Sequence, residues 1–516
     1  MRVWRRVRID VRVAVLGLAV WLCQPSTAAA QAADPIAAAY QRLYAGHPDA
    51  AFGEFSTART RDAQALPPWF GQLFAQFARL QADESLEAGF ARDADAFIEA
   101  ATARYTRSEN DAEALFYLAQ AHMLRGTFRA TSDKSIWGAA RDAARSKSYA
   151  EDYVKAHPEH GDAYLTLGLY NYYVGIAPTF VKVLRVLLFL PGGNRAAGLQ
   201  QIERAAKTGS LFAPIAEGVL GTIYGALEGR LADGIAIGEH LSERFPENAF
   251  VRLSLAQLYS HPTIEAYGRA EEQYRAILAS ATSASLLDQS DRQRGTLGLA
   301  QLRRTQWRVE EAISLLTPVI DRAPQKPEWI LPTFLLQRAG YRMLLNDPAA
   351  GADAARVSGE RRWSKWHDEA RETSAQITKW RARSAEAAIY TSLIPANRLV
   401  VEDRWEEARA AYDAIDAAHP GDWQVRYRLA YLDFARGQYS TAAAAPQSIG
   451  ASSARMPDWL RANALLTLAW THDIAGRRND ALALYRRVVD DYGDESAAGP
   501  ARLGLLAPYK KGPVRK

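Results

Sequence analysis

The chain is 516 residues long and contains a single cysteine, Cys23. Cys23 lies in an apolar stretch near the amino terminus, so the rest of the chain contains no thiol. Without thiols, that part can form no disulfide, no thiolate nucleophile and no cysteine-ligated metal site. The absence of cysteine therefore excludes a disulfide-stapled domain and thiol-based catalysis.

The chain also lacks a hydrophobic run of about 20 residues, the length that a membrane-spanning helix needs. Its amino terminus instead carries a shorter apolar run of eleven residues, 13–23, followed by small residues spaced for signal peptidase, at Ala28 and Ala30 or at Ala30 and Ala32. Five arginines precede this run: Arg2, Arg5, Arg6, Arg8 and Arg12. This three-part pattern predicts a signal peptide over residues 1–30 and a periplasmic or secreted mature protein. A membrane anchor and a lipid anchor at Cys23 are the weaker alternatives.

The excess of positive charge is confined to this targeting segment. The whole chain has 63 Lys and Arg against 58 Asp and Glu, a formal net charge of +5. Removing residues 1–30 takes away five arginines and one aspartate, which lowers the net charge to +1. A chain so nearly neutral has no electrostatic signature of nucleic-acid binding, so we expect no nucleic-acid partner.

Motifs that carry chemistry are scarce. The sequence contains no H-E-x-x-H, no G-x-S-x-G and no G-x-G-x-x-G. His157 and His160 flank Pro158, and no further ligand stands near them in sequence. We interpret both as solvated loop histidines rather than as metal ligands. No catalytic residue, no metal and no cofactor are therefore expected.

Gly193 and Gly198 have the spacing of a phosphate-binding loop, G-x4-G. Leu199 and Gln200 stand where such a loop needs Lys and Ser or Thr, so the loop lacks its phosphate chemistry. The segment is better interpreted as a turn in which Asn194 caps a helix that begins at Arg195.

What the chain does contain is a repeat. A small residue, a turn residue seven positions later and an alanine five positions after that recur in the same order. The sets are Ala300, Trp307 and Ala312; Ala430, Gly437 and Ala442; Ala469, Gly476 and Ala481. This spacing predicts two antiparallel helices that approach closely through their small residues, with the turn residue between them. One such pair cannot bury its apolar face alone, so the pairs are expected to stack.

The pattern resembles the tetratricopeptide repeat family, whose units place a small residue, an alanine, an aromatic and a proline at fixed positions. The unit at 408–420 shows the second half as Ala408, Tyr412 and Pro420. The resemblance implies an all-α solenoid of stacked helix-turn-helix units that serves as a binding scaffold. In the unit that contains Ala442, Pro446 falls inside the second helix, which we expect to end early or kink.

The predicted organisation follows from the repeats. It comprises the signal peptide at 1–30, helical hairpins at 31–107, an array with enlarged units at 108–280, a second array at 281–507 and a basic tail at 508–516. A serine-rich joint at 278–291 divides the two arrays.

Two neighbouring units are enlarged between their helices. The alanine-type position of one falls near Ser146, and that of the next falls at Gly198, with an insertion over 176–193. The insertion, with the start of the following helix, is our predicted docking element: Phe180, Leu184, Leu187, Leu188 and Arg195. The stripe could instead cover its own array or touch lipid. Deleting 176–193 should leave the helical content nearly unchanged and abolish partner capture.

The resemblance also implies a groove lined by the first helix of each unit. The aromatic residues at these positions are Phe116, Tyr172, Tyr173, Tyr427, Tyr431, Phe434 and Trp470. They could hold an extended peptide or an apolar helix, or they could be core residues. Leu165 and Leu169 stand where carboxylate-binding members of the family carry Lys and Asn, so recognition of a C-terminal carboxylate is not expected.

Together these features predict an exported scaffold that binds another protein or peptide in a bacterial cell envelope and does no catalysis itself. An accessory protein that binds lipid or glycan in an aromatic groove is the first alternative. An unrecognised enzyme is the second.

Overall fold

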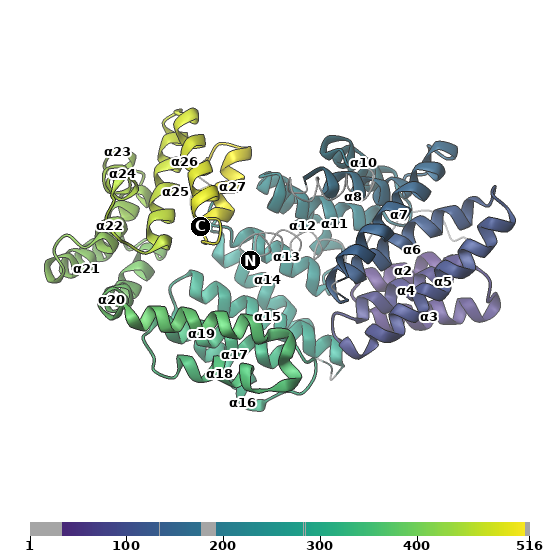
Figure 1. Cartoon of the computed structure of the whole chain (residues 1–516), viewed down its shortest axis with the longest axis horizontal. Helices are drawn as coiled ribbons and strands as arrows, with labels where there is room; N and C mark the ends of the chain where they lie inside the picture. Colours follow the sequence, from purple (N-terminus) through teal and green to yellow (C-terminus); the bar gives the residue numbers. More distant parts are fainter. Residues whose placement is uncertain (1–33, 134, 177–191, 282, 284, 511–516) are drawn as a thin grey trace. The chain divides into compact units, whose positions relative to one another are not determined.

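In the computed structural model of the chain, the described residues are 34–133, 135–176, 192–281, 283 and 285–510. Over these ranges the chain is helical and contains no β-strand, and most helices pack against the helix that follows them in sequence (Figure 1). The predicted all-α solenoid of stacked helix pairs is therefore confirmed.

The chain divides into two compact units. Unit 1 comprises Met1–Leu255 and Thr282–Gln289, and unit 2 comprises Ala256–Ala281 and Ser290–Lys516. The helices up to the first boundary are α2 (Pro35–Tyr44), α3 (Pro48–Arg61), α4 (Leu66–Arg79), η1 (Glu84–Leu86), α5 (Glu87–Arg107), α6 (Ala112–Thr131), α7 (Ile136–Ala156), α8 (Ala163–Ile176), α10 (Arg195–Thr208), α11 (Ala213–Thr222), η2 (Ile223–Leu227), α12 (Leu231–Arg244) and α13 (Ala249–Tyr259). Those that follow are α14 (Tyr267–Ser280), α15 (Leu286–Thr305), α16 (Val309–Arg322), α17 (Ile330–Leu344), α18 (Ala350–Gly359), η3 (Arg361–Trp366), α19 (His367–Ala382), α20 (Ser384–Val401), α21 (Trp405–Ala418), α22 (Trp423–Ala435), α23 (Tyr439–Ala442), α24 (Ala444–Ala451), α25 (Asp458–Ile474), α26 (Arg478–Asp491) and α27 (Ala498–Leu506).

The turn residue of the repeat has a left-handed backbone conformation. Gly437 and Gly476 have φ angles of 81° and 72°, and Trp307 occupies the equivalent turn with a φ of 62°. The alanine five positions later is buried in each of the three pairs. The same rule holds in α2 and α3, where Gly46 has a φ of 94° and Ala51 is fully buried. Glycine adopts this conformation without a steric penalty, whereas tryptophan does so only under strain.

The register predicted for the enlarged units is confirmed. Gly198 is buried in α10, in line with Ile202 and Ala205, and Asn194 caps the helix by accepting a hydrogen bond from the Ala197 amide at 3.1 Å. In the preceding pair, Ser146 is fully buried and its Oγ donates to the Ala119 carbonyl at 2.7 Å.

The two enlarged pairs use their extra residues differently. The first lengthens its helices, because α6 and α7 have 20 and 21 residues and only a short turn between them. In the second, most of the insertion, residues 177–191, lies outside the described residues. A methyl group on Gly175 would lie 2.5 Å from the Arg195 nitrogen, so the chain segments on either side of the insertion adjoin.

Pro446 affects its helix as predicted. The second helix of this pair is split into α23 and α24, and Pro446 is the third residue of α24. In the first turn of a helix the missing amide hydrogen of proline has no partner to lose. The helix therefore restarts at a point where proline is tolerated.

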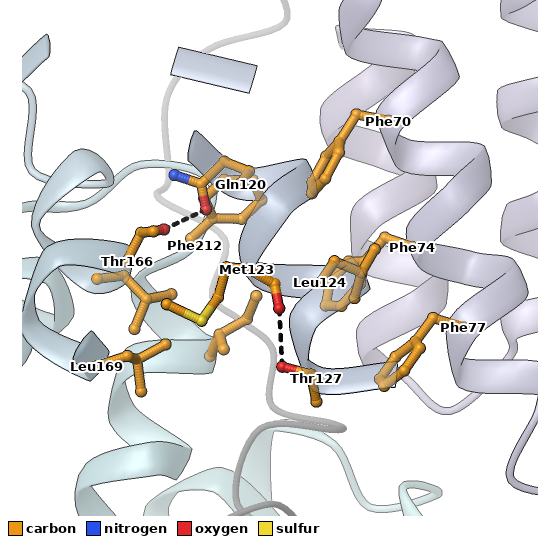
Figure 2. Close-up of a pocket in the computed structure, with 12 residues that line it drawn as sticks. Phe70, Phe74, Phe77, Gln120, Met123, Leu124, Thr127, Thr166, Leu169 and Phe212 are labelled. Carbon is orange, nitrogen blue, oxygen red and sulfur yellow. Dashed lines mark hydrogen bonds between the residues drawn. The ribbon is translucent and has the colours of Figure 1, made fainter. Parts of the chain in front are cut away.

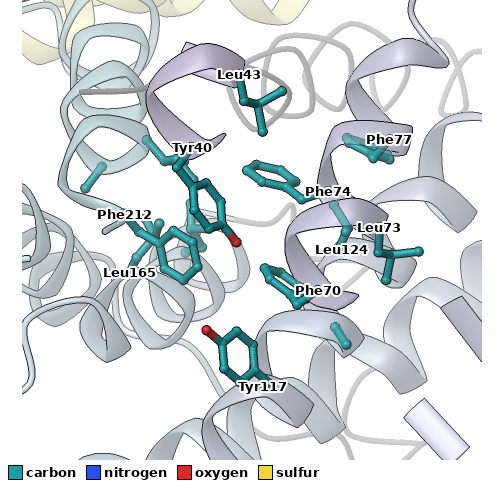
Figure 3. Packing of buried hydrophobic residues seen from close by; sticks show 14 of the residues in the cluster. Tyr40, Leu43, Phe70, Leu73, Phe74, Phe77, Tyr117, Leu124, Leu165 and Phe212 are labelled. Atoms are coloured by element: carbon teal, nitrogen blue, oxygen red, sulfur yellow. The ribbon is translucent and has the colours of Figure 1, made fainter. Parts of the chain in front are cut away.

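The core of unit 1 is one continuous apolar cluster that runs from α2 to α13. Phe212 belongs to this cluster and contacts Tyr40 and Phe70, with ring centroids 5.7 and 6.2 Å away (Figure 3). The buried carboxylate of Asp162 fixes this position, since it accepts hydrogen bonds from the backbone amides of Leu211 and Phe212 at 2.9 and 2.7 Å. In unit 2 the core is instead split into several smaller clusters.

A buried polar network joins α6 to α7. The Asp142 side chain is 1% exposed and accepts hydrogen bonds from His122 Nδ1 at 2.8 Å and Arg129 Nη1 at 2.7 Å. Arg125 donates to both oxygens, at 3.0 and 2.5 Å, and also to the exposed Asp95 at 2.5 Å. Because the carboxylate only accepts, His122 must carry its proton on Nδ1. The network compensates the cost of burying the Asp142 charge.

This network predicts acid sensitivity in unit 1. Burial alone would raise the pKa of Asp142, but hydrogen bonds from His122 and Arg125 outweigh burial and lower the pKa from 3.8 to about 2. A folded-state pKa below the ordinary value means that the stabilisation is complete above roughly pH 4 and is lost as the pH falls through 2. We expect amide hydrogen exchange in α6 and α7 to accelerate, relative to unstructured peptides, over this window. The Asp142→Asn variant, which cannot titrate there, should lack this part of the pH dependence.

Candidate binding cleft of unit 2

Of the predicted groove residues of unit 1, Phe116 and Tyr172 are buried in its core, and the partly buried Tyr173 packs against that core. Phe116 is 6% exposed and stacks on Phe212 and His160, with ring centroids 6.0 and 5.0 Å away. Tyr172 is fully buried, and its hydroxyl donates to Glu228 at 2.5 Å. The ring of Tyr173 lies 5.4 Å from that of Tyr172. These three side chains take part in the packing of unit 1.

The first helices of successive pairs in unit 1, α4, α6, α8 and α11, line a small apolar pocket (Figure 2). Its polar lining includes Gln120, which accepts a hydrogen bond from Thr166 at 2.6 Å, and Thr127, which donates to the Met123 carbonyl at 2.9 Å. Helix α2 is packed into the same part of the core, since Tyr44 donates to the Leu211 carbonyl at 2.6 Å. Helix α2 and the pocket therefore share one apolar core.

The structure also shows the surroundings of two further residues that the sequence singled out. His160 is not a freely solvated loop residue, because its Nδ1 lies 2.7 Å from the Tyr153 hydroxyl and its ring stacks on Phe116. Arg195, assigned to the docking element, forms a two-point ion pair with Glu228, the residue that also accepts from Tyr172. The other docking residues, Phe180, Leu184, Leu187 and Leu188, lie outside the described residues.

Unit 2 has a larger cleft, of about 1060 Å³ including space open to solvent. Its walls come mainly from α20, α22 and α25, with contributions from the end of α15 and the segment before α27. Its lining residues are Pro262, Glu265, Tyr267, Arg304, Thr305, Trp307, Asn397, Val400, Val401, Tyr412, Tyr427, Arg428, Tyr431, Asn463, Leu466, Thr467, Trp470, Ser496, Ala497 and Pro500. Three of the predicted groove residues are among them.

These three aromatic residues belong to a row of rings. The centroids of Tyr427 and Tyr431 are 6.2 Å apart, and Tyr431 is the same distance from Phe434, which packs behind the cleft wall. Phe434 lies 5.9 Å from Trp470. Tyr427, Phe434 and Trp470 are buried, whereas Tyr431 is half-buried. The three buried rings hold the cleft wall in place, and the ring of Tyr431 remains partly accessible to a ligand.

Tyr509 extends this row, although the sequence pattern placed it in a basic tail. Its ring stacks on Trp470 at 4.8 Å, and its amide donates to the Asp473 carboxylate at 2.7 Å. Asp473 also accepts from Tyr485 at 2.7 Å and pairs with Arg478. Tyr509, which follows α27, is therefore held against α25 by contacts with Trp470 and Asp473.

The cleft also contains two arginines that sequence reasoning missed, Arg304 and Arg428. Arg428 lies with its guanidinium carbon 4.6 Å above the Trp307 ring. Its Nε is buried without a hydrogen-bond partner. The available signal was the placement of Arg428 between the groove residues Tyr427 and Tyr431, on the first helix of its pair. Sequence reasoning gave weight only to the aromatic residues of that helix.

Within the described ranges, no group of three or more His, Asp or Glu side chains is arranged to hold a metal ion. A membrane-crossing helix is also not found there, because none is both long and apolar enough.

Comparisons with known proteins add little to this picture. No family model matches the chain, and no curated protein matches it. Among solved structures, the chain is similar to the "Human IFIT1 dimer with m7Gppp-AAAA", with 12% identity, 94% of each chain covered and a TM-score of 0.21. A TM-score this low does not establish a shared arrangement of helices, and neither fold nor function transfers from it.

Proposed function

We propose that this chain is an exported scaffold of the tetratricopeptide repeat type that binds another protein through the cleft of unit 2. The observation that carries the proposal is the open cleft itself, with Tyr431 half-buried at its wall and two arginines beside it. A cleft with aromatic walls can hold an extended segment of a partner at little entropic cost, since the rings are already fixed by packing.

The repeat type is supported by the spacing of small and turn residues, which recurs from Gly46 and Ala51 to Gly476 and Ala481. Export is supported by the arginine-rich, apolar and small-residue pattern of residues 1–30. The bacterial cell envelope is the compartment that this pattern favours. Mass spectrometry of the purified native protein should give a chain that starts near Gln31, and a full-length cytosolic chain would contradict export.

Lipid or glycan binding has less support than protein binding. The apolar pocket of unit 1 is the natural place for an acyl chain, but it is the smaller of the two spaces, at about 450 Å³ against about 1060 Å³ for the cleft of unit 2. Among the described residues, the most deeply buried ionic network offers no free carboxylate for catalysis, because Asp142 is already paired with Arg125 and Arg129.

Site-specific photo-cross-linking tests the proposal. A photoreactive phenylalanine at Asn463, which lines the cleft, should form adducts with a discrete protein in intact cells. As the control, the photoreactive phenylalanine is placed instead at Arg426, which is exposed on the same helix as Tyr427, and it should form no adduct there. Adduct formation at Asn463 should fall when Tyr431→Ala is added. Equal labelling at the two positions, or no adduct at Asn463, would contradict a partner in the cleft.

A further inference from the structure

Arg304 and Arg428 differ from the arginines around them. Arg303 pairs with Glu271 at 2.7 Å, and Arg308 pairs with Glu402 at 2.9 Å. Within the described ranges, by contrast, neither the Arg304 nor the Arg428 guanidinium has a carboxylate at ion-pair distance or an acceptor at hydrogen-bond distance. Two uncompensated cations therefore line one cleft.

The surroundings of Arg428 hold its guanidinium in place without satisfying it. The guanidinium carbon lies 4.6 Å from the Trp307 ring centre, 5.3 Å from that of Tyr427 and 5.9 Å from that of Trp459. Ring faces attract the positive charge but accept no strong hydrogen bond, and the buried Nε remains unpaired. An unpaired buried donor is costly, and a planar guanidinium is suited to a two-point bond with a carboxylate.

Trp307 is held under strain to provide this platform. It has a φ of 62° at a turn position where the equivalent residues of two other pairs are Gly437 and Gly476. A bulky residue in the left-handed region persists only where its surroundings compensate the strain, and such residues concentrate at functional sites. Here the strained residue is the one that carries Arg428 on its ring.

The acidic content of the cleft is low. Among the described residues that line it, Glu265 is the one carboxylate, and it is already engaged with the Tyr267 hydroxyl at 3.3 Å. The unpaired charge of the cleft is therefore positive, and its complement is a ligand that carries carboxylates.

We propose that the cleft of unit 2 binds an extended acidic segment of the partner, whose carboxylates pair with Arg304 and Arg428 while its apolar side chains pack against Tyr431. This inference rests on the proposed function and specifies the chemistry of the partner. The buried rings favour a peptide over single-stranded nucleic acid, because base stacking needs an open ring face. Tyr427 and Trp470 are 3% and 5% exposed, and Arg428 covers Trp307.

Selection from a random peptide-display library against the full-length protein tests the inference. Enriched peptides should be rich in Asp and Glu, with apolar residues between them. A synthetic peptide from the selection should bind at least 10-fold more weakly to Arg428→Ala and to Arg304→Ala, since each loses a charge-assisted hydrogen bond. Arg428→Lys should also bind more weakly, because it keeps the charge but loses the planar fork.

Two further variants control for folding and for net charge. Arg428→Met keeps an unbranched side chain over Trp307, so it separates loss of binding from loss of packing if the alanine variant unfolds. Arg426→Ala removes the same charge from the exposed side of α22 and should leave affinity unchanged.

The possible failures are distinguishable. Neutral enriched peptides that bind the cleft independently of both arginines would overturn the acidic inference and leave the proposed function standing. Enriched peptides whose affinity is unchanged by Tyr431→Ala and by both arginine variants, or the absence of any enrichment, would overturn the acidic inference and the proposed function together. Binding of oligouridylate that competes with the selected peptide and depends on Arg304 and Arg428 would overturn the peptide assignment in favour of nucleic acid.

Discussion

Replacing Asp142 with alanine should destabilise the α6–α7 pair by about 3–5 kcal/mol. The change leaves His122, Arg125 and Arg129 facing a site from which their common acceptor has gone. Asp142 is 1% exposed, so water does not readily replace the lost carboxylate. Removing one partner from a buried ionic network lowers the stability strongly, because the opposite charges stay buried and uncompensated.

Native-state hydrogen exchange of the full chain, followed in peptides from these two helices, measures this loss. Asp95→Ala is the matched control, because it removes another carboxylate that pairs with Arg125. The Asp95 side chain is 60% exposed. We expect it to cost less than about 1 kcal/mol, since solvent screens an exposed ion pair. Equal effects for the two variants would show that the buried network does not hold the helices together.

Replacing Gly198 with alanine should destabilise the α8–α10 pair by about 2–3 kcal/mol or more, as overpacking does in tight cores. The new methyl group would lie 2.3 Å from the Tyr172 backbone nitrogen and 2.8 Å from the Gly168 carbonyl oxygen. Both contacts are with backbone, so no side-chain rotation relieves them. The two helices would have to move apart along a buried interface.

Gly53→Ala is the matched control for Gly198→Ala. Gly53 lies within α3, and a methyl group there would meet nothing within 4 Å. This substitution should stabilise unit 1 by roughly 0.5–1 kcal/mol, because alanine loses less backbone entropy than glycine in a helix. Thermal unfolding monitored by circular dichroism should therefore shift in opposite directions for the two variants. A neutral Gly198→Ala would mean that the helices do not approach as closely as described.

Local features of the fold were predictable where the determinant is short in sequence. The buried positions of Ser146, Gly198 and Ala442 follow from repeat spacing, because a helix pair needs its small residues at fixed distances from its turn. The cap at Asn194 and the break near Pro446 follow from the chemistry of single residues. These determinants act within one helix pair.

The ionic network has a sequence signal on one of its two helices only. His122, Arg125 and Arg129 form a polar stripe on one face of an otherwise apolar helix, which indicates a buried acceptor. Which of several acidic residues supplies that acceptor depends on how α7 packs against α6. Asp142 was therefore indistinguishable from an exposed aspartate in the sequence.

The predicted groove residues have different surroundings in the two units, for a related reason. The repeat positions of Phe116 and Tyr427 are similar, yet Phe116 stacks on Phe212 in the core of unit 1 and Tyr427 lines a cleft in unit 2. The difference arises because residues distant in sequence, among them Phe212 and Tyr40, close over the first site. Contacts between residues distant in sequence therefore decide whether the predicted groove positions of a helix pair are open to a ligand.

The sequence by itself determined the helices, their pairing and their register, because helical periodicity, turn conformation and small-residue contacts operate over a few tens of residues. Only the tertiary structure decided which aromatic residues are core and which line a cleft, and which charges are compensated. Burial and electrostatic pairing depend on every element packed around a side chain. The contacts of Arg428 with Trp307 and of Asp142 with Arg125 are examples, because each joins residues of different helices or turns that come together only in the folded chain.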